Sequence, residues 1–248
     1  MENKKVALVT GGMGGLGLAI CQRLNRAGYK VATTYSPSNP TPEAWLAAQR
    51  DEGFRFTAYK VDVNDYADCE WMMQKLLAEM GGVDVLVNNA GITRDASLRK
   101  MSHADWRAVL GTNLDSVFNM SKQAVEPMMA QRAGRIINIS SVNAQQGAFG
   151  QANYAAAKAG MHGFTKALAL EVARHGITVN TVSPGYLRTK MVMKVPTDIL
   201  ESRILPQIPV GRLGEPAEVA ALIAYLVSDE AAFITGANIA INGGQHMA

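Results

Sequence analysis

Short apolar runs alternate with helical segments along the whole chain, and this alternation restricts the fold more than any other sequence feature. The runs are rich in β-branched residues and end in glycine or polar residues, as buried strands do; they lie at 4–12, 29–36, 54–63, 83–91, 135–141, 177–185 and 237–244. Strands joined by helices run parallel, with right-handed crossovers. The pattern therefore predicts a Rossmann-like α/β fold, a doubly wound parallel sheet with helices on both faces.

Helices are expected between these strands. The first, at 16–28, closes at Gly28, and the one at 155–176 closes at Gly176, because glycine readily ends a helix. The remaining helices are expected to end near Gly53, to run from Asn64 or Asp65 to Met80, and to occupy 102–130 and 215–229. No linker, repeat or low-complexity tract interrupts the pattern, so we expect a single domain over residues 1–248.

Composition excludes several functional classes. The net charge of +3 is small and dispersed, which argues against a nucleic-acid partner. No apolar run is long enough to cross a bilayer and no signal peptide is recognisable, so we expect no membrane association and a cytoplasmic location. Cys21 and Cys69 lack the spacing of a redox or zinc motif, and the histidines are scattered. We therefore expect no metal site.

One region departs from the regular alternation. Residues 186–212 contain Pro196, Pro206 and Pro209, which interrupt both helices and strands. The region directly follows the sixth strand, at the edge of the sheet where open α/β sheets bind ligands. We interpret it as a lid over the site, with a plain connection as the alternative.

A glycine-rich turn, TGGMGGLG, occupies residues 10–17 between the first strand and the first helix. Glycines let the backbone approach a phosphate closely, and the helix N-terminus offers unpaired N–H groups. The spacing of Gly11, Gly15 and Gly17 differs from the usual G-x-G-x-x-G. The position of the turn nevertheless predicts a nucleotide cofactor.

The end of the second strand bears on which nucleotide binds. NAD-binding proteins typically place an acidic side chain there to bind the ribose 2′-hydroxyl. Residues 33–36 read TTYS, and no acid follows until Glu43. The absence of an acid permits a 2′-phosphate, which the hydroxyls of Tyr35, Ser36 and Ser38 are able to bind. NADP is therefore the expected cofactor.

Ser141, Tyr154 and Lys158 follow the fifth strand. Tyr154 and Lys158 are four residues apart and share a helix face. An ammonium near a phenol favours the phenolate, so we expect the pKa of Tyr154 to be lowered toward working pH. A serine hydroxyl on the preceding loop is able to bind the same substrate oxygen. The segment predicts a proton donor, a group that tunes it and a substrate-orienting hydroxyl.

Eight motifs in order, TGGMGGLG, VDV, NNAG, Asn113, Ser141, Tyr154, Lys158 and SPG, make the chain similar to the short-chain dehydrogenase/reductase family along its whole length. The resemblance implies a catalytic tetrad of Asn113, Ser141, Tyr154 and Lys158. Tyr154 would protonate a ketone oxygen, and Lys158 would bind the nicotinamide ribose. Asn113 would hold a water for reprotonation, with a structural bond to the backbone as the alternative.

The resemblance also implies the residues that contact the cofactor. They lie in the glycine turn, after the second, third and fourth strands, on the catalytic helix and after the sixth strand: Thr10, Gly11, Gly12, Met13, Gly14, Gly15, Leu16, Gly17, Tyr35, Asp62, Val63, Asn89, Ala90, Gly91, Ile92, Tyr154, Lys158, Pro184, Gly185, Leu187 and Thr189.

Within the family, the chain is similar to bacterial acetoacetyl-CoA reductases, through GGMGG, SSVNAQQGAFGQANY and NGGQHM. NADPH-dependent reduction of acetoacetyl-CoA to (R)-3-hydroxybutyryl-CoA for polyhydroxyalkanoate (polyhydroxybutyrate) synthesis is the implied function. The implied acyl-CoA contacts are Asp95, Ser141, Ala148, Phe149, Gly150, Gln151, Gly185 and Tyr186.

Two alternatives remain. The 3-oxoacyl-acyl-carrier-protein reductases share NNAGITRD and GQANYAAAKAG, but they usually carry an arginine at the position of Gly14, where it meets the 2′-phosphate. The glycine favours a CoA thioester and weakens the inference to NADP. A non-catalytic NADP-binding sensor is the other alternative, which the intact tetrad disfavours. The family resemblance also implies a homotetramer.

Overall fold

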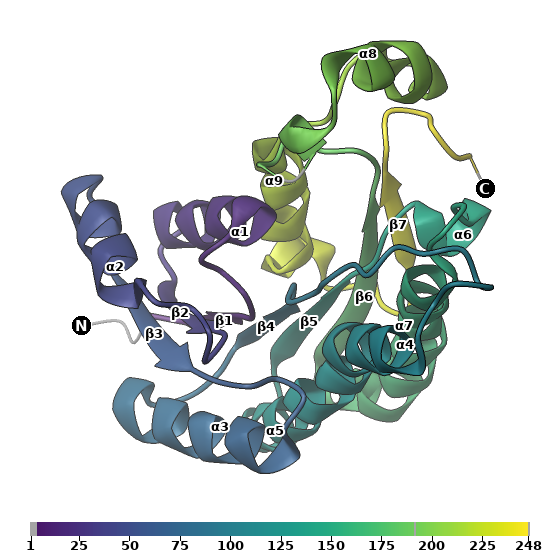
Figure 1. Cartoon of the computed structure of the whole chain (residues 1–248). Coiled ribbons are helices and arrows are strands. Elements are labelled where there is room, and N and C mark those ends of the chain that lie inside the picture. The colour runs from purple at the N-terminus through teal and green to yellow at the C-terminus, as the bar shows by residue number, and fades with distance from the viewer. Residues whose placement is uncertain (1–3, 191, 248) are drawn as a thin grey trace.

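The computed structural model describes residues 4–190 and 192–247. Its strands form one parallel sheet in the order β3-β2-β1-β4-β5-β6-β7, as Figure 1 shows. The strands are β1 (Val6–Val9), β2 (Lys30–Tyr35), β3 (Phe56–Lys60), β4 (Val85–Asn88), β5 (Gly134–Ile139), β6 (Ile177–Pro184) and β7 (Asn238–Ile241). The predicted doubly wound sheet is confirmed. The strand order reverses between β1 and β4, which creates the crevice where such sheets bind ligands.

Helices cover both faces of the sheet (Figure 1). One face carries α3 (Tyr66–Met80), α4 (His103–Leu110), α5 (Ser116–Gln131) and α7 (Ala152–Val172), and the other carries α1 (Gly15–Arg26), α2 (Pro42–Asp51) and α9 (Pro216–Leu226). Alternate strand residues point to opposite layers. Val6 and Leu8 pack with α3 and α5, whereas Ala7 and Val9 pack with α1 and α9.

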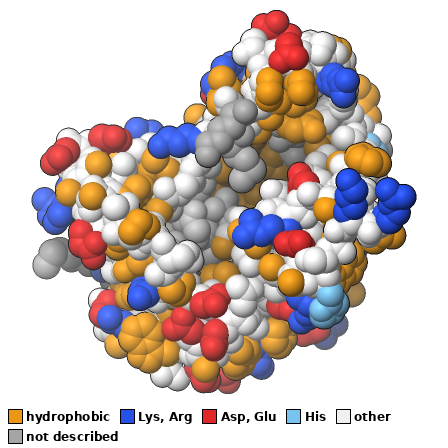
Figure 2. All heavy atoms as spheres, viewed as in Figure 1, with side chains coloured by type: hydrophobic (Ala, Val, Ile, Leu, Met, Phe, Trp, Pro, Cys, Tyr) orange, Lys and Arg blue, Asp and Glu red, His pale blue; other side chains and the backbone are white. Residues whose placement is uncertain are grey.

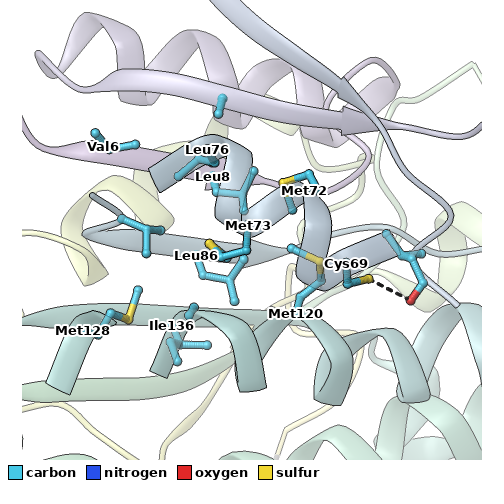
Figure 3. Packing of buried hydrophobic residues seen from close by; sticks show 14 of the residues in the cluster. Val6, Leu8, Cys69, Met72, Met73, Leu76, Leu86, Met120, Met128 and Ile136 are labelled. Carbon is cyan, nitrogen blue, oxygen red and sulfur yellow. Dashed lines mark hydrogen bonds between the residues drawn. The ribbon is translucent and has the colours of Figure 1, made fainter. Parts of the chain in front are cut away.

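Methionine side chains from two helices fill much of one core. Met72 and Met73 of α3 and Met120 and Met128 of α5 belong to one buried cluster with Leu86, part of which Figure 3 shows. Unbranched methionines adapt to irregular gaps between helices and a twisted sheet. Cys69 and Cys21 lie buried in opposite layers, and burial raises the pKa of each thiol to about 12. Cys69 Sγ also donates a hydrogen bond to the Val63 carbonyl oxygen at 3.6 Å (Figure 3).

The helix expected at 102–130 contains a wider turn. A π-helical turn, Gly111–Asp115, separates α4 from α5. Gly111 lies so close to Asn64 that an added Cβ would stand 2.8 Å from Asn64 Oδ1. The expected helical region is therefore confirmed, and the tertiary contact at Gly111 accompanies a π turn within it. A further short helix, α6 (Asn143–Gln146), was not predicted.

The region after β6 forms a separate helical layer above the sheet (Figure 1). It contains a 3₁₀ turn at Val192–Lys194, α8 (Thr197–Ile199), a π turn at Leu200–Ile204 and a 3₁₀ turn at Leu205–Gln207. Ile204, Ile208 and Leu213 give this layer its own small core. The predicted lid region at 186–212 thus has helical structure, and its role as a lid stays a prediction.

Candidate active site

A cleft of about 740 Å³ opens at the carboxyl ends of the strands. The surface is hollowed beneath the helical segment that contains α8 (Figure 2). The cleft runs from the end of β2 past the glycine turn to Tyr154, Gly185 and Tyr186. Its length brings together most of the residues predicted to contact cofactor, and it also reaches Ser141 and Lys158.

The glycine turn is fixed by crowding on one side and left open on the other. The Gly12 N–H donates to Thr33 Oγ1 at 2.9 Å, and the Gly11 N–H donates to Thr34 Oγ1 at 3.2 Å. A Cβ on Gly17 would stand 2.5 Å from the Gly11 carbonyl oxygen, whereas a Cβ on Gly14 would meet nothing within 4 Å. The turn therefore presents bare backbone to the cleft.

The first N–H groups of α1 complete this backbone surface. Gly14 is the N-cap residue and supplies no side-chain hydrogen bond, so these N–H groups stay free for a ligand. Leu16 and Gly15 also line the cleft. Open backbone, a helix N-terminus and a long cleft fit the diphosphate of a dinucleotide.

Thr10 and Asn89 join the loops after β1 and β4. Thr10 Oγ1 accepts hydrogen bonds from the N–H groups of Asn89 and Ala90, both at 3.0 Å. Asn89 Nδ2 donates to the carbonyl oxygens of Thr10 and Gly11. Asn89 lines the cleft, but Thr10 lies beneath the turn and does not. Thr10 therefore supports the loop after β4 through hydrogen bonds without lining the cleft itself.

The predicted adenosine end of the cleft has no acidic group on β2. Thr34, Tyr35 and Ser36 line it there. Ser36 Oγ and Ser38 Oγ lie 2.9 Å apart, so the two hydroxyls form one polar edge. Asp62 lines the opposite wall, and its Oδ1 accepts hydrogen bonds from the N–H and Nδ2 of Asn64. Asp62 is thereby occupied in shaping the turn after β3.

Asn113 lies in the π turn with no exposed surface. Its Oδ1 accepts from the Ile92 N–H at 2.8 Å, and its Nδ2 donates to the Ile92 carbonyl at 2.9 Å. A single amide therefore satisfies both backbone groups of Ile92. Asn113 does not line the cleft, although its Oδ1 would stand 3.0 Å from a Cβ on Gly91, which does. The backbone bonds of the alternative are present, and the predicted role of Asn113 in holding a water stays a prediction.

Ser141, Tyr154 and Lys158 lie together on the cleft wall. Ser141 follows β5, while Tyr154 and Lys158 project from the first turns of α7. Lys158 Nζ lies 5.7 Å from the centre of the Tyr154 ring and donates to the Ile139 carbonyl at 2.6 Å. The arrangement holds a phenol, a hydroxyl and an amine at one point of the cleft.

The pKa values of this group differ from the sequence-based expectation. Burial raises the pKa of Tyr154, the Ser141 hydroxyl lowers it, and the charge of Asp95 raises it. Burial also lowers the pKa of the Lys158 ammonium to about 7. The expected lowering of the Tyr154 pKa by Lys158 is therefore wrong for this structure, because desolvation of the phenolate dominates. The phenol is protonated at neutral pH and able to donate.

The predicted substrate residues divide into two groups. Ser141, Gln151, Gly185 and Tyr186 line the cleft, whereas Asp95, Ala148, Phe149 and Gly150 lie outside its lining. The Phe149 side chain is 97% exposed. It therefore does not pack on the cleft wall.

Other predicted cofactor residues also fall outside the lining. Gly12 and Met13 belong to the glycine turn but do not line the cleft. Asn39 Nδ2 contacts Met13 Sδ at 3.3 Å. Several lining residues were missed by sequence reasoning, and most of them adjoin a predicted residue in the chain: Thr34, Val61, Asn64, Thr93, Thr112, Ile139, Ser140, Val142, Asn143, Lys190 and Val192. Proximity to a motif was the one signal available for them.

The described residues provide neither a cluster of metal ligands nor a helix suited to a membrane. Within 4–190 and 192–247, no group of three or more His, Cys, Asp or Glu side chains is placed to hold a metal ion. Across the same ranges, no helix combines the length and the apolar character that a bilayer span requires.

Comparison with known proteins places this site in a family. Residues 5–200 match the family described as short chain dehydrogenase, so the chain belongs to it. It is accordingly an oxidoreductase that uses a nicotinamide cofactor. The acetoacetyl-CoA reductases of Cupriavidus necator and Rhizobium meliloti are 53% and 52% identical to it over 244 residues, 98% of this chain and 99% of each relative. The 3-oxoacyl-[acyl-carrier-protein] reductase of Escherichia coli is 47% identical over 243 residues, 98% of both chains.

Proposed function

We propose that the protein is an NADPH-dependent acetoacetyl-CoA reductase that produces (R)-3-hydroxybutyryl-CoA for polyhydroxyalkanoate synthesis. The observation that carries the proposal is the similarity to acetoacetyl-CoA reductases over nearly the whole chain. Ser141, Tyr154 and Lys158, gathered on one wall of the cleft, supply the groups that ketone reduction needs.

The cofactor would lie along the cleft, with its phosphates on the glycine turn, its ribose at Lys158 and its carboxamide near Thr189. When bound, the nicotinamide supplies the hydride that reduces the ketone carbon. Negative charge then grows on the substrate oxygen. The Ser141 hydroxyl stabilises that charge by a hydrogen bond, and Tyr154 delivers the proton. Because the pKa of Tyr154 is raised, the phenol is protonated at neutral pH and has that proton to donate.

The preference for NADPH is proposed from the end of β2. No acid there would repel a 2′-phosphate, and the paired Ser36 and Ser38 hydroxyls offer donors to it. Gly14 weighs against the preference, because it leaves open space where the carrier-protein reductases usually carry an arginine that meets the 2′-phosphate. Comparing kcat/KM for NADPH and NADH tests this preference, and equal values would overturn it.

Reduction of a carrier-protein thioester is the second candidate, because the Escherichia coli carrier-protein reductase is nearly as similar. The deciding experiment measures kcat/KM with acetoacetyl-CoA and with acetoacetyl-carrier protein at saturating NADPH. We expect acetoacetyl-CoA to be favoured. A higher value for the carrier-protein substrate would establish the second candidate instead.

Assembly as a homotetramer in the cytoplasm is also part of the proposal. Phe118 on α5 is 51% exposed and Leu170 on α7 is 85% exposed. Large apolar side chains on two adjacent helices are suited to a symmetric contact between copies of the chain. Light scattering of the purified protein measures the mass directly, and a monomeric mass would contradict the tetramer.

A further inference from the structure

Two neighbouring segments beside the cleft are joined by hydrogen bonds to backbone carbonyl groups. The Ala96 N–H donates to the Gly150 carbonyl at 2.9 Å, and Asn153 Nδ2 donates to the Arg94 carbonyl at 3.0 Å. The loop after β4 and the loop before α7 thus form one wall. Asp95 lies on the first loop and Gln151 on the second, which places their side chains face to face.

Three side chains along this wall form a continuous hydrogen-bond chain. Gln151 Nε2 donates to Asp95 Oδ2 at 2.9 Å, and Asn143 Nδ2 donates to Gln151 Oε1 at 2.9 Å. An ionised carboxylate only accepts hydrogen bonds, so Gln151 must turn its NH₂ group toward Asp95. Its carbonyl oxygen then faces Asn143, which must donate. The charge of Asp95 therefore fixes the direction of the whole chain.

Asn143 connects this chain to the proposed catalytic serine. Asn143 is 9% exposed and lines the cleft. Its backbone N–H donates to Ser141 Oγ at 3.2 Å. A serine oxygen that already accepts from the backbone keeps its own hydrogen for another partner. The residue that orients Gln151 thus also orients the Ser141 hydroxyl.

The hydrogen-bond chain of Asn143, Gln151 and Asp95 also changes the role expected for Gln151. The resemblance implies a direct contact with substrate, yet both polar ends of the Gln151 amide are already bonded within the protein. Breaking the bond to Asn143 would leave the partly buried amide oxygen of Gln151 unpaired, which is unfavourable. A substrate therefore meets a Gln151 side chain whose orientation is fixed in advance.

We propose that Asn143 is a positioning residue, and that the chain Asn143–Gln151–Asp95 fixes the substrate-side wall beside Ser141 through the direction of its hydrogen bonds. This proposal rests on the proposed function, which identifies that wall as the substrate side. It requires that activity depends on which of the three side chains donate and which accept hydrogen bonds, and not only on their sizes.

Exchanging the polar ends of the chain tests this polarity. In Asn143→Asp, two acceptor-only carboxylates compete for one NH₂ group of Gln151, so we expect kcat/KM for acetoacetyl-CoA to fall roughly tenfold. Asp95→Asn retains an acceptor oxygen, and a smaller loss is expected. The double variant Asp95→Asn with Asn143→Asp permits Gln151 to turn over, donating to residue 143 and accepting from residue 95. It should recover to within about threefold of Asp95→Asn.

Gln146→Glu is the matched control. Gln146 is exposed on α6, the same short helix as Asn143, and belongs to none of these bonds. Like Asn143→Asp, the Gln146→Glu substitution introduces a carboxylate, but it reverses no hydrogen bond. We therefore expect kcat/KM to stay near the wild-type value. The KM for NADPH should be unchanged in all four variants, because the chain lies on the substrate side of the cleft.

A double variant no more active than Asn143→Asp would overturn the proposal. Failure of the proposed function looks different, because the wild-type protein would then not reduce acetoacetyl-CoA at all. In that case the thermal unfolding temperatures of the cofactor-free variants test the proposed hydrogen-bond chain. The proposal requires Asn143→Asp to unfold at a lower temperature than the double variant, and equal temperatures would refute it.

Discussion

Lys158 Nζ donates a hydrogen bond of 2.6 Å to the carbonyl oxygen of Ile139. Burial lowers the pKa of this ammonium from 10.5 to about 7. Between these two values the unfolded chain binds more protons at Lys158 than the folded protein does. Folding stability must therefore rise with pH across this window.

Lys158→Met removes this linkage. As pH rises from 7 to 9, the cofactor-free wild-type protein should gain stability over Lys158→Met, by at most about 1.4 kcal/mol per pH unit. Urea unfolding at several pH values measures the difference. Lys122→Met, at an exposed position on α5, is the matched control for the loss of a lysine side chain. A constant difference between wild type and Lys158→Met would mean that the buried amine does not titrate in this window.

Tyr154→Phe removes the proposed proton donor and keeps the ring. General acid catalysis contributes about 10²–10⁴-fold, so kcat should fall by a factor in this range. Binding of NADPH, followed by its fluorescence, should persist, because the glycine turn is untouched. Turnover near the wild-type rate would remove Tyr154 from the mechanism.

The alkaline limb of the pH–rate profile reports the ionisation of Tyr154. Ketone reduction needs the protonated phenol, so kcat/KM should fall as pH rises through the Tyr154 pKa. The Ser141 hydroxyl lowers that pKa and the Asp95 charge raises it. The limb should therefore move to higher pH in Ser141→Ala and to lower pH in Asp95→Asn. Shifts in the same direction in both variants would contradict these causes.

The strands and the glycine turn were predictable because their determinants are local. β-Branched runs and glycine positions specify them without reference to distant residues. The π turn depends instead on Asn113, whose amide bonds both backbone groups of Ile92, and on Asn64 packed against Gly111. No local pattern reveals such contacts.

The same limit applies at the candidate site. The Tyr154 pKa follows from burial, which no spacing of Tyr and Lys encodes, and proximity in sequence suggested the opposite shift. The direction of the Asn143–Gln151 bond is set by Asp95, which is far away in sequence. Sequence motifs therefore located the proposed reacting groups, while their ionisation and orientation required the fold.

Two neighbouring glycines in the cofactor turn should respond differently to alanine. A Cβ on Gly12 would collide with Thr33 Oγ1 and stand 2.7 Å from Cys21 Sγ. Thr33 Oγ1 accepts from the Gly12 N–H and donates to the Val9 carbonyl at 2.8 Å, so the collision disturbs the junction of β1 and β2. Gly12→Ala should destabilise the protein by about 1–3 kcal/mol.

Gly14→Ala is the matched comparison within the same turn. Gly14 has a φ of −123°, which any residue adopts, and open space around its Cβ position. Its effect on the free energy of unfolding should stay within about 0.5 kcal/mol. Urea unfolding of the cofactor-free variants measures both. Equal losses of stability would mean that both substitutions act through the backbone of the turn and not through the space around each Cβ. The predicted difference would distinguish the packed side of the turn from its open side.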